Sequence, residues 1–111
     1  MAYSSAHLRK TNWDLGGKVG GSVYCYDTAD AVATVYAIGY ITDAWAKGMR
    51  KGDLVIYRKW TTAPPAADSE VLTAAGTANV FLGHTLMSVI GISTAGAADL
   101  TDGTLVTVTN T

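Results

Sequence analysis

The stretch YDTADAVATVYAIGYITDAWAKGMRKGDLVIY, residues 26–57, decides most of the fold. Asp27 or Thr28 is suited to cap a helix, and Asp30 follows Asp27 by three residues, as in a capping box. An apolar stripe at helical spacing comes next, formed by Val32, Val35, Tyr36 and Gly39. The pattern predicts a three-turn helix over residues 28–38, which Gly39 ends in a left-handed conformation.

The same stretch continues with turn and strand signals. Thr42 and Asp43 precede a short helical turn over residues 44–47, and Gly48 closes it. Lys51, Gly52 and Asp53 form a turn signal, and residues 54–60 are typical of a strand. Upstream, the alternating segment 22–26 predicts a strand that leads into the helix cap.

The second half of the chain predicts further strands. Residues 80–82 and 85–93 read as two strands, or as one bent strand interrupted by Gly83, and residues 97–100 read as a short strand. Asp102-Gly103 is the strongest hairpin signal in the sequence. The closing run 104–109 is a strand by composition, with Val106 and Val108 favoured for the core face.

These elements predict one β-rich α+β domain. We expect an extended N-terminal arm over residues 1–21 and a single domain over residues 22–111, with a long loop at 61–79. A small sheet with one three-turn helix on its face and a partly closed barrel both satisfy the pattern.

The composition is poor in charge. Only 15% of residues are charged, against about 25% in ordinary soluble domains, while the chain has 17 alanines, 15 threonines and 12 glycines. Because few ions must lose their water, such a surface packs against other protein at little cost. We interpret the chain as a subunit that works inside an assembly; a merely neutral, Thr-rich β domain is the alternative.

Side chains that carry chemistry are sparse, and we predict no catalytic, cofactor-binding or metal site. His7 and His84 lack neighbouring ligands in sequence, and a single cysteine, Cys25, forms neither a disulfide nor a metal framework. The glycines of residues 16–21 lack the spacing of a phosphate-binding loop. With no long apolar run and no signal peptide, we expect no membrane partner and synthesis in a cytoplasm.

Basic and aromatic residues raise the question of nucleic-acid binding. Arg50 and Lys51 precede the strand that ends with Arg58 and Lys59, and tryptophans lie near both pairs. At about 3.3 Å per residue, that strand separates the pairs by roughly 25 Å. The net charge is −1. A solvated or subunit-facing role is therefore favoured, and we expect no specific nucleic-acid partner.

The chain resembles a group of small virion proteins of tailed bacteriophages, of the head-decoration, cement or head-fibre kind. The segments that carry the resemblance are MAYSS at the start, YDTADAVATVYAIGYITDA at 26–44, MRKGDLVIY at 49–57 and DLTDGTLVTVTNT at 99–111. The similarity covers about half of the chain, mainly residues 22–58 and 97–111. The long segment 61–79 and the basic residues Arg50, Arg58 and Lys59 set this chain apart.

The resemblance implies a non-enzymatic structural protein of the virion, assembled in the host cytoplasm. We expect a capsid decoration or cement subunit that bridges neighbouring major capsid subunits, with other virion proteins and further copies of itself as additional partners. A tail-fibre or host-recognition module is the alternative. The residues expected at the interface lie in the arm, at the end of the 54–60 strand and in the loop: Arg9, Lys10, Trp13, Arg58, Lys59, Trp60, Pro64 and Pro65.

Overall fold

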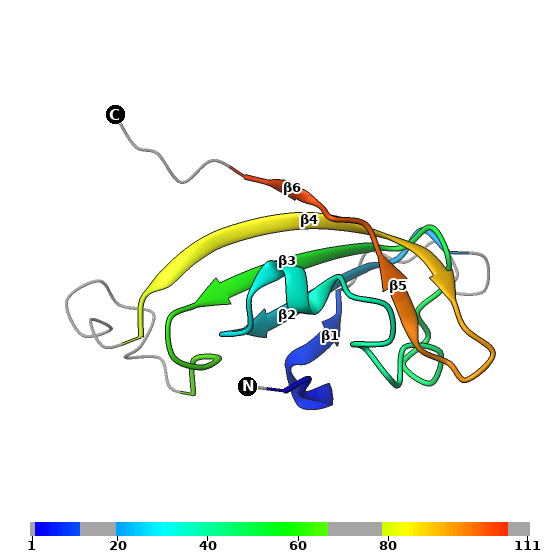
Figure 1. Cartoon of the computed structure of the whole chain (residues 1–111), viewed down its shortest axis with the longest axis horizontal. Helices are drawn as coiled ribbons and strands as arrows, with labels where there is room; N and C mark the ends of the chain where they lie inside the picture. The colour runs from blue at the N-terminus through cyan, green and yellow to red at the C-terminus, as the bar shows by residue number, and fades with distance from the viewer. Residues whose placement is uncertain (1, 12–19, 67–78, 107–111) are drawn as a thin grey trace.

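A computed structural model describes residues 2–11, 20–66 and 79–106. Its elements follow in chain order: η1 (Ser5–His7), β1 (Leu8–Lys10), β2 (Val23–Thr28), α1 (Val32–Val35), β3 (Leu54–Trp60), β4 (Phe81–Ile92), β5 (Ala98–Leu100) and β6 (Thr104–Leu105). Within the described ranges, the strands form one six-stranded sheet in the order β1-β2-β3-β4-β5, with β6 paired to β4 (Figure 1). The β-rich fold is confirmed, and the sheet is open, not closed into a barrel.

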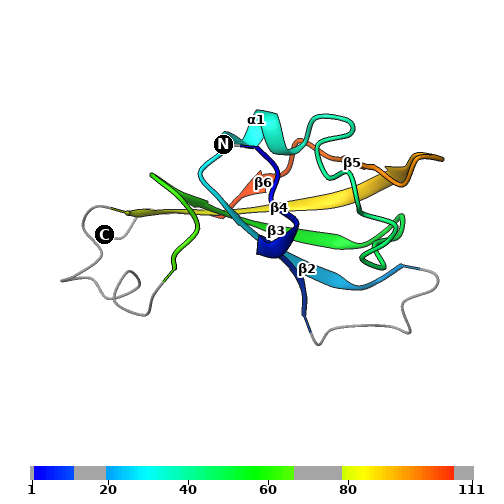
Figure 2. The ribbon, with the colours of Figure 1, turned by 90° about the horizontal axis from the view of Figure 1, so that it is seen from below.

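One pair of neighbouring strands is parallel. β2 runs parallel to β3, while β1 is antiparallel to β2 and β4 is antiparallel to β3. Parallel neighbours require a crossover connection, and here residues 29–53 supply it. This connection, which includes α1, lies against one face of the sheet (Figure 2). No helix in the described ranges is long and apolar enough to cross a membrane.

The core lies between the sheet and this crossover connection. Alternation along the strands points every second side chain toward the connection. The sheet contributes Tyr24, Tyr26, Val55, Tyr57, Met87 and Val89, and the connection contributes Val35, Ile41, Ala44 and Met49. Every side chain in this set is at most 3% exposed, so a small open sheet obtains a closed core by covering one face.

The predicted three-turn helix is wrong in its length and its cap. α1 contains only four residues, and its N-cap is Ala31, with no side-chain hydrogen bond. Asp27 and Thr28 instead extend β2, where they pair with Arg58 and Lys59 of β3. Pairing in the sheet outweighed the local capping preference of these two residues.

Two predicted turn residues have the expected conformation or role. Gly39 is left-handed, with a φ of +85°, but it does not end the helix: α1 ends at Val35 with Tyr36 as its C-cap, and the Gly39 N–H donates to the carbonyl of Ala98. Asp53 is 1% exposed and accepts hydrogen bonds from the backbone N–H groups of Ser22 and Arg50 at 3.0 and 2.8 Å. Its carboxylate therefore fixes the turn that starts β3.

The N-terminal arm is partly integrated into the sheet. Leu8, Arg9 and Lys10 form β1, which pairs with Tyr26, Cys25 and Tyr24 of β2. Leu8 is 2% exposed and belongs to the core. The aperiodic sequence gave no sign of this strand, because a three-residue edge strand is too short to show alternation.

β4 is one strand of 12 residues, as one of the two sequence readings proposed, and both later strands pair along its second edge. β5 pairs with residues 89–92 and β6 pairs with Thr85 and Leu86, so Asp102-Gly103 does not form the predicted hairpin. Gly103 has a φ of +88°, and a Cβ there would lie 2.6 Å from Cγ2 of Thr85. The glycine lets the chain pass closely over β4.

The end of the described chain also departs from the prediction. Leu105 and Val106 are 62% and 42% exposed, so Val106 does not face the core. Val108 lies outside the described residues. β6 covers only two residues of β4, which is too little pairing to bury its own side chains.

Candidate interaction surface

The sheet face opposite α1 carries apolar side chains in register. Cys25 pairs with Ile56, and Ile56 pairs with Leu86, so these three side chains form a row across the sheet. Leu54 and Ile90 lie on the same side by alternation. We call this surface the open face, defined by Cys25, Leu54, Ile56, Leu86 and Ile90. Leu86 and Ile90 are 38% and 49% exposed, and the other three are half-buried.

A buried carboxylate organises one end of the open face. Asp27 is 2% exposed, and its Oδ2 accepts a hydrogen bond of 2.5 Å from Nη2 of Arg9. Its Oδ1 accepts a hydrogen bond of 2.9 Å from Nε1 of Trp60 and lies 3.3 Å from Nη1 of Arg58. Two cations share one carboxylate, so this end keeps a net positive charge.

Aromatic rings extend this charged end toward β4. The ring of Phe81 lies 5.2 Å from that of Trp60 and 4.8 Å from that of His84. The guanidinium of Arg58 lies 5.6 and 5.9 Å from the Trp60 and Phe81 rings, within the range of cation–π attraction. We call these six residues the Asp27 cluster: Arg9, Asp27, Arg58, Trp60, Phe81 and His84.

Three of the predicted interface residues meet in this cluster. Arg9 and Arg58 have side chains that are 60% and 30% exposed, so both are accessible to a partner. Trp60 is only 3% exposed, so little of its ring is accessible to a partner.

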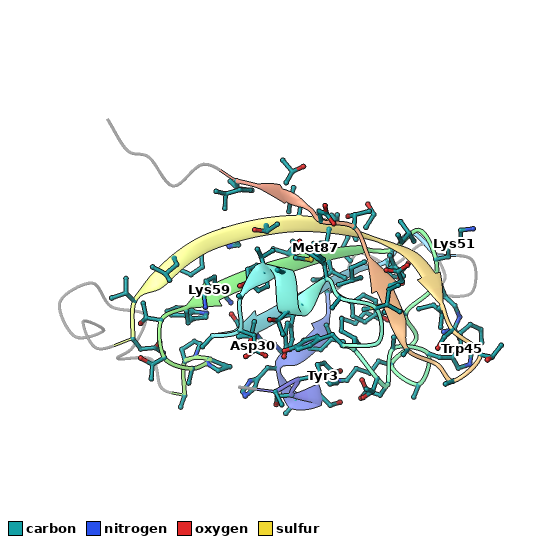
Figure 3. All side chains as sticks on the ribbon, viewed as in Figure 1. Tyr3, Asp30, Trp45, Lys51, Lys59 and Met87 are labelled. Carbon is teal, nitrogen blue, oxygen red and sulfur yellow. The ribbon has the colours of Figure 1, made fainter. Side chains whose placement is uncertain are left out.

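The remaining basic residues point elsewhere. Lys59 donates from Nζ to the carbonyl of Ala29, in the crossover connection, and Lys10 pairs with Tyr24 on the side opposite Arg9. Lys51 and Lys59 lie toward opposite ends of the molecule, which separates the two basic pairs as the strand length predicted (Figure 3). Trp13 lies outside the described residues.

The base of the 61–79 loop is pinned by one side chain. Asn79 is 8% exposed; its Oδ1 accepts from the N–H groups of Thr62 and Ala63, and its Nδ2 donates to the carbonyl of Ala63 at 2.7 Å. Pro64 is buried and Pro65 is half-buried. The two prolines therefore pack at the loop base, and residues 67–78 lie outside the described part of the chain.

Hydrogen bonds from the N-terminal segment hold β1, and with it Arg9, in place. Tyr3 and Ser5 both donate to the carboxylate of Asp43. Burial and the hydrogen bond to Asp43 raise the pKa of Tyr3 above its ordinary value. Burial opposes ionisation of Asp43, but the hydrogen bonds from Ser5 and Tyr3 outweigh it and lower the pKa of that carboxyl. The segment is anchored to an ionised carboxylate.

A second tyrosine network lies beside this anchor. The Tyr40 hydroxyl donates to Oδ2 of Asp30 at 2.5 Å, so the Tyr26 hydroxyl, 2.7 Å away, donates to Tyr40. Burial, followed by the hydrogen bond to Asp30, raises the pKa of Tyr40. Burial also raises the pKa of Asp30, but hydrogen bonds, including that from Tyr40, lower it overall. Tyr57 donates to the carbonyl of Asp30 at 2.5 Å, and burial raises the pKa of Tyr57 to about 12.

Sequence reasoning missed the apolar part of the open face. Leu86 and Ile90 alternate with the buried Met87 and Val89, so this part of β4 is apolar on both sides. Strands that are apolar on both sides are usually covered on both sides, and this signal could have identified the face.

The chain matches no known family model, no curated protein and no solved structure. Within the described ranges, no group of three or more His, Cys, Asp or Glu side chains is placed to hold a metal ion. The fold and the surface together define an open mixed β-sheet domain with one covered face and one apolar face that carries a positive charge at one end.

Proposed function

We propose that the protein is a non-enzymatic structural subunit of a tailed-bacteriophage virion, and that it decorates the capsid by docking its open face onto major capsid subunits. The observation that carries the proposal is the exposure of Leu86 and Ile90 on the sheet face opposite α1. Apolar side chains in register, bordered by polar groups, are typical of interaction surfaces. The resemblance to small virion proteins supplies the kind of partner.

The charge distribution supports a protein partner with an acidic surface. Arg9 and Arg58 keep one uncompensated positive charge beside the apolar row, while the chain as a whole carries −1. An acidic group of the capsid opposite Arg9 would orient the subunit, and apolar contact at Leu86 and Ile90 would supply most of the affinity. Many copies over one shell would add modest individual energies into a large stabilisation.

Reattachment to particles tests this proposal. Particles that lack the protein are incubated with wild-type protein, Leu86→Asp, Ile90→Asp or Ile38→Asp, and the bound copies are counted by quantitative mass spectrometry. Ile38 is 81% exposed and lies in the crossover connection, away from the open face, which makes it a matched control. Burial of one such side chain is worth about 1.5–3 kcal/mol, so the two open-face variants should bind at least ~10-fold more weakly.

The outcomes separate the candidate functions. Equal attachment of all four proteins would refute docking through the open face. Particles that lack the protein should lose DNA at a lower temperature than complete particles if the protein is cement. If they are equally robust but fail to adsorb to cells, the host-recognition module replaces the decoration subunit.

A further inference from the structure

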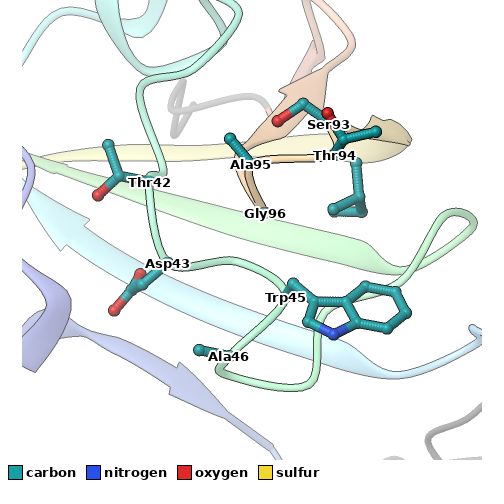
Figure 4. A pocket seen from close by; sticks show the side chains of 9 residues that line it. Thr42, Asp43, Trp45, Ala46, Ser93, Thr94, Ala95 and Gly96 are labelled. Atoms are coloured by element: carbon teal, nitrogen blue, oxygen red, sulfur yellow. The ribbon is translucent and has the colours of Figure 1, made fainter.

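A surface cavity lies at the far end of the molecule from Lys59. It has a volume of about 430 Å³, within the range of small-molecule sites. One wall is the segment 42–46, and the other is the turn that joins β4 to β5 (Figure 4). The lining residues are Thr42, Asp43, Trp45, Ala46, Ile92, Ser93, Thr94, Ala95 and Gly96.

The indole of Trp45 is exposed and yet held in place. The guanidinium of Arg50 stacks 3.3 Å from the centre of the ring. Nη1 of Arg50 also donates to the carbonyls of Trp45 and Met49, at 3.2 and 2.8 Å. The backbone N–H of Trp45 donates to the carbonyl of Gly96 at 3.0 Å. Trp45 is nevertheless 55% exposed, so a fixed aromatic surface faces solvent at the cavity.

Apart from the Arg50 guanidinium stacked on Trp45, the residues that line the cavity carry polar groups and no cation. Thr42, Ser93 and Thr94 carry hydroxyls, and the Ser93 Oγ accepts from the N–H of Ala97 at 3.1 Å, which leaves its own proton for a ligand. The Asp43 carboxylate, held by Tyr3 and Ser5, has lone pairs left to accept further hydrogen bonds. In Figure 4 the hydroxyls of Ser93 and Thr94 lie on the same side of the cavity as the indole, whereas the side chains of Thr42 and Asp43 point the other way. Hydroxyls and an aromatic ring suit a neutral ligand with many hydroxyl groups and one apolar face.

We infer that this cavity is a binding site for a pyranose sugar. The apolar C–H face of the sugar would pack on the face of the Trp45 indole that Arg50 does not cover, and the sugar hydroxyls would exchange hydrogen bonds with Ser93 and Thr94. Because the Trp45 indole is already held in one position, little side-chain entropy is lost when the sugar binds. A single sugar has about a dozen non-hydrogen atoms, so a dissociation constant on the order of millimolar is expected. The inference does not depend on attachment to a capsid.

An NMR titration tests the site directly. The ¹⁵N-labelled full chain is titrated with the methyl glycosides of glucose, galactose and N-acetylglucosamine, each to roughly ten times the expected constant. We expect saturable shifts of the Trp45 indole N–H and of the amides of residues 93–96 with at least one sugar. Trp45→Ala should abolish them, and Thr94→Val should weaken binding several-fold. Ile38→Ala, an exposed substitution outside the cavity, should bind like wild type.

The contrary results are equally definite. If no glycoside shifts the Trp45 indole signal, the cavity is not a sugar site. If shifts occur but persist in Trp45→Ala, while the rest of the spectrum shows a folded protein, the sugar binds elsewhere and the inference fails.

Discussion

Replacement of Asp27 by alanine should destabilise the protein strongly, although the residue caps no helix. Asp27 is 2% exposed and accepts hydrogen bonds from Arg9 and Trp60 while pairing with Arg58. Each of these three partners would lose its acceptor. The decrease in stability that each lost contact causes therefore depends on how deeply that partner is buried.

The three losses differ in size. Trp60 is 3% exposed, so its unpaired N–H costs about 1–3 kcal/mol. Arg58, with a side chain that is 30% exposed, adds on the order of 1 kcal/mol, while Arg9 is 60% exposed and contributes about 0–1 kcal/mol because water replaces its partner. We expect the free energy of unfolding to fall by a total of roughly 2–5 kcal/mol, or Tm to fall by about 8–20 °C.

A double-mutant cycle identifies the cause. Asp27→Ala, Trp60→Phe and the double variant are compared with wild type by chemical denaturation. Trp60→Phe keeps an aromatic ring beside Phe81 but removes the N–H donor. The double variant should therefore be less destabilised than the sum of the single variants, by about 1–2 kcal/mol.

Two results would refute this reasoning. A decrease in the free energy of unfolding below about 0.5 kcal/mol for Asp27→Ala would show that the carboxylate does not stabilise its three partners. Additive effects of the two substitutions would show that Asp27 and Trp60 do not interact.

Two further predictions concern glycine conformation and tyrosine ionisation. Gly39→Ala should lower the free energy of unfolding by about 1–2 kcal/mol, because a φ of +85° disfavours a residue with a Cβ, although the Cβ would meet open space. Gly103→Ala should lower it clearly more, because its Cβ would also clash with Thr85. Equal Tm values for the two variants would contradict this prediction. Tyr57 has a folded pKa of about 12, above the unfolded value near 10, so it contributes stability that is present below pH 10 and is lost as pH rises toward 12. Denaturation measured across that window should show a shallower decline for Tyr57→Phe than for wild type.

The elements that could be predicted were those whose local signals agree with their tertiary environment. The strand over residues 54–60 appears with the predicted bounds, because its apolar run is buried between two neighbouring strands. Gly39 and Gly48 have the positive φ values that their turns require. In these places the local preference and the packing favour the same conformation.

The predictions that were wrong share one physical cause, which is strand pairing between segments far apart in the sequence. Asp27 and Thr28 are good capping residues, but pairing with Arg58 and Lys59, 31 positions later, extends the strand through them. Asp102-Gly103 is a good hairpin turn, but both flanking strands find partners on β4. A single sequence does not show which distant segment competes for a residue.

The candidate surface was predictable only in part. Arg9 and Arg58 were selected as basic residues, but the carboxylate that joins them had been assigned to a helix cap. Leu86 and Ile90 were overlooked, because their exposure depends on which side of the sheet the crossover connection covers. The handedness and path of that connection are properties of the whole fold.

The short β1 strand has a consequence for solubility. An unpaired sheet border is a template on which other chains can add strands, and proteins limit this hazard with short borders and charged side chains. β1 is only three residues long and includes Arg9 and Lys10, and on the opposite side β5 and β6 occupy successive parts of β4. Such borders discourage strand-by-strand polymerisation at high concentration, so crowded copies of this chain should stay distinct and avoid growth into fibrils.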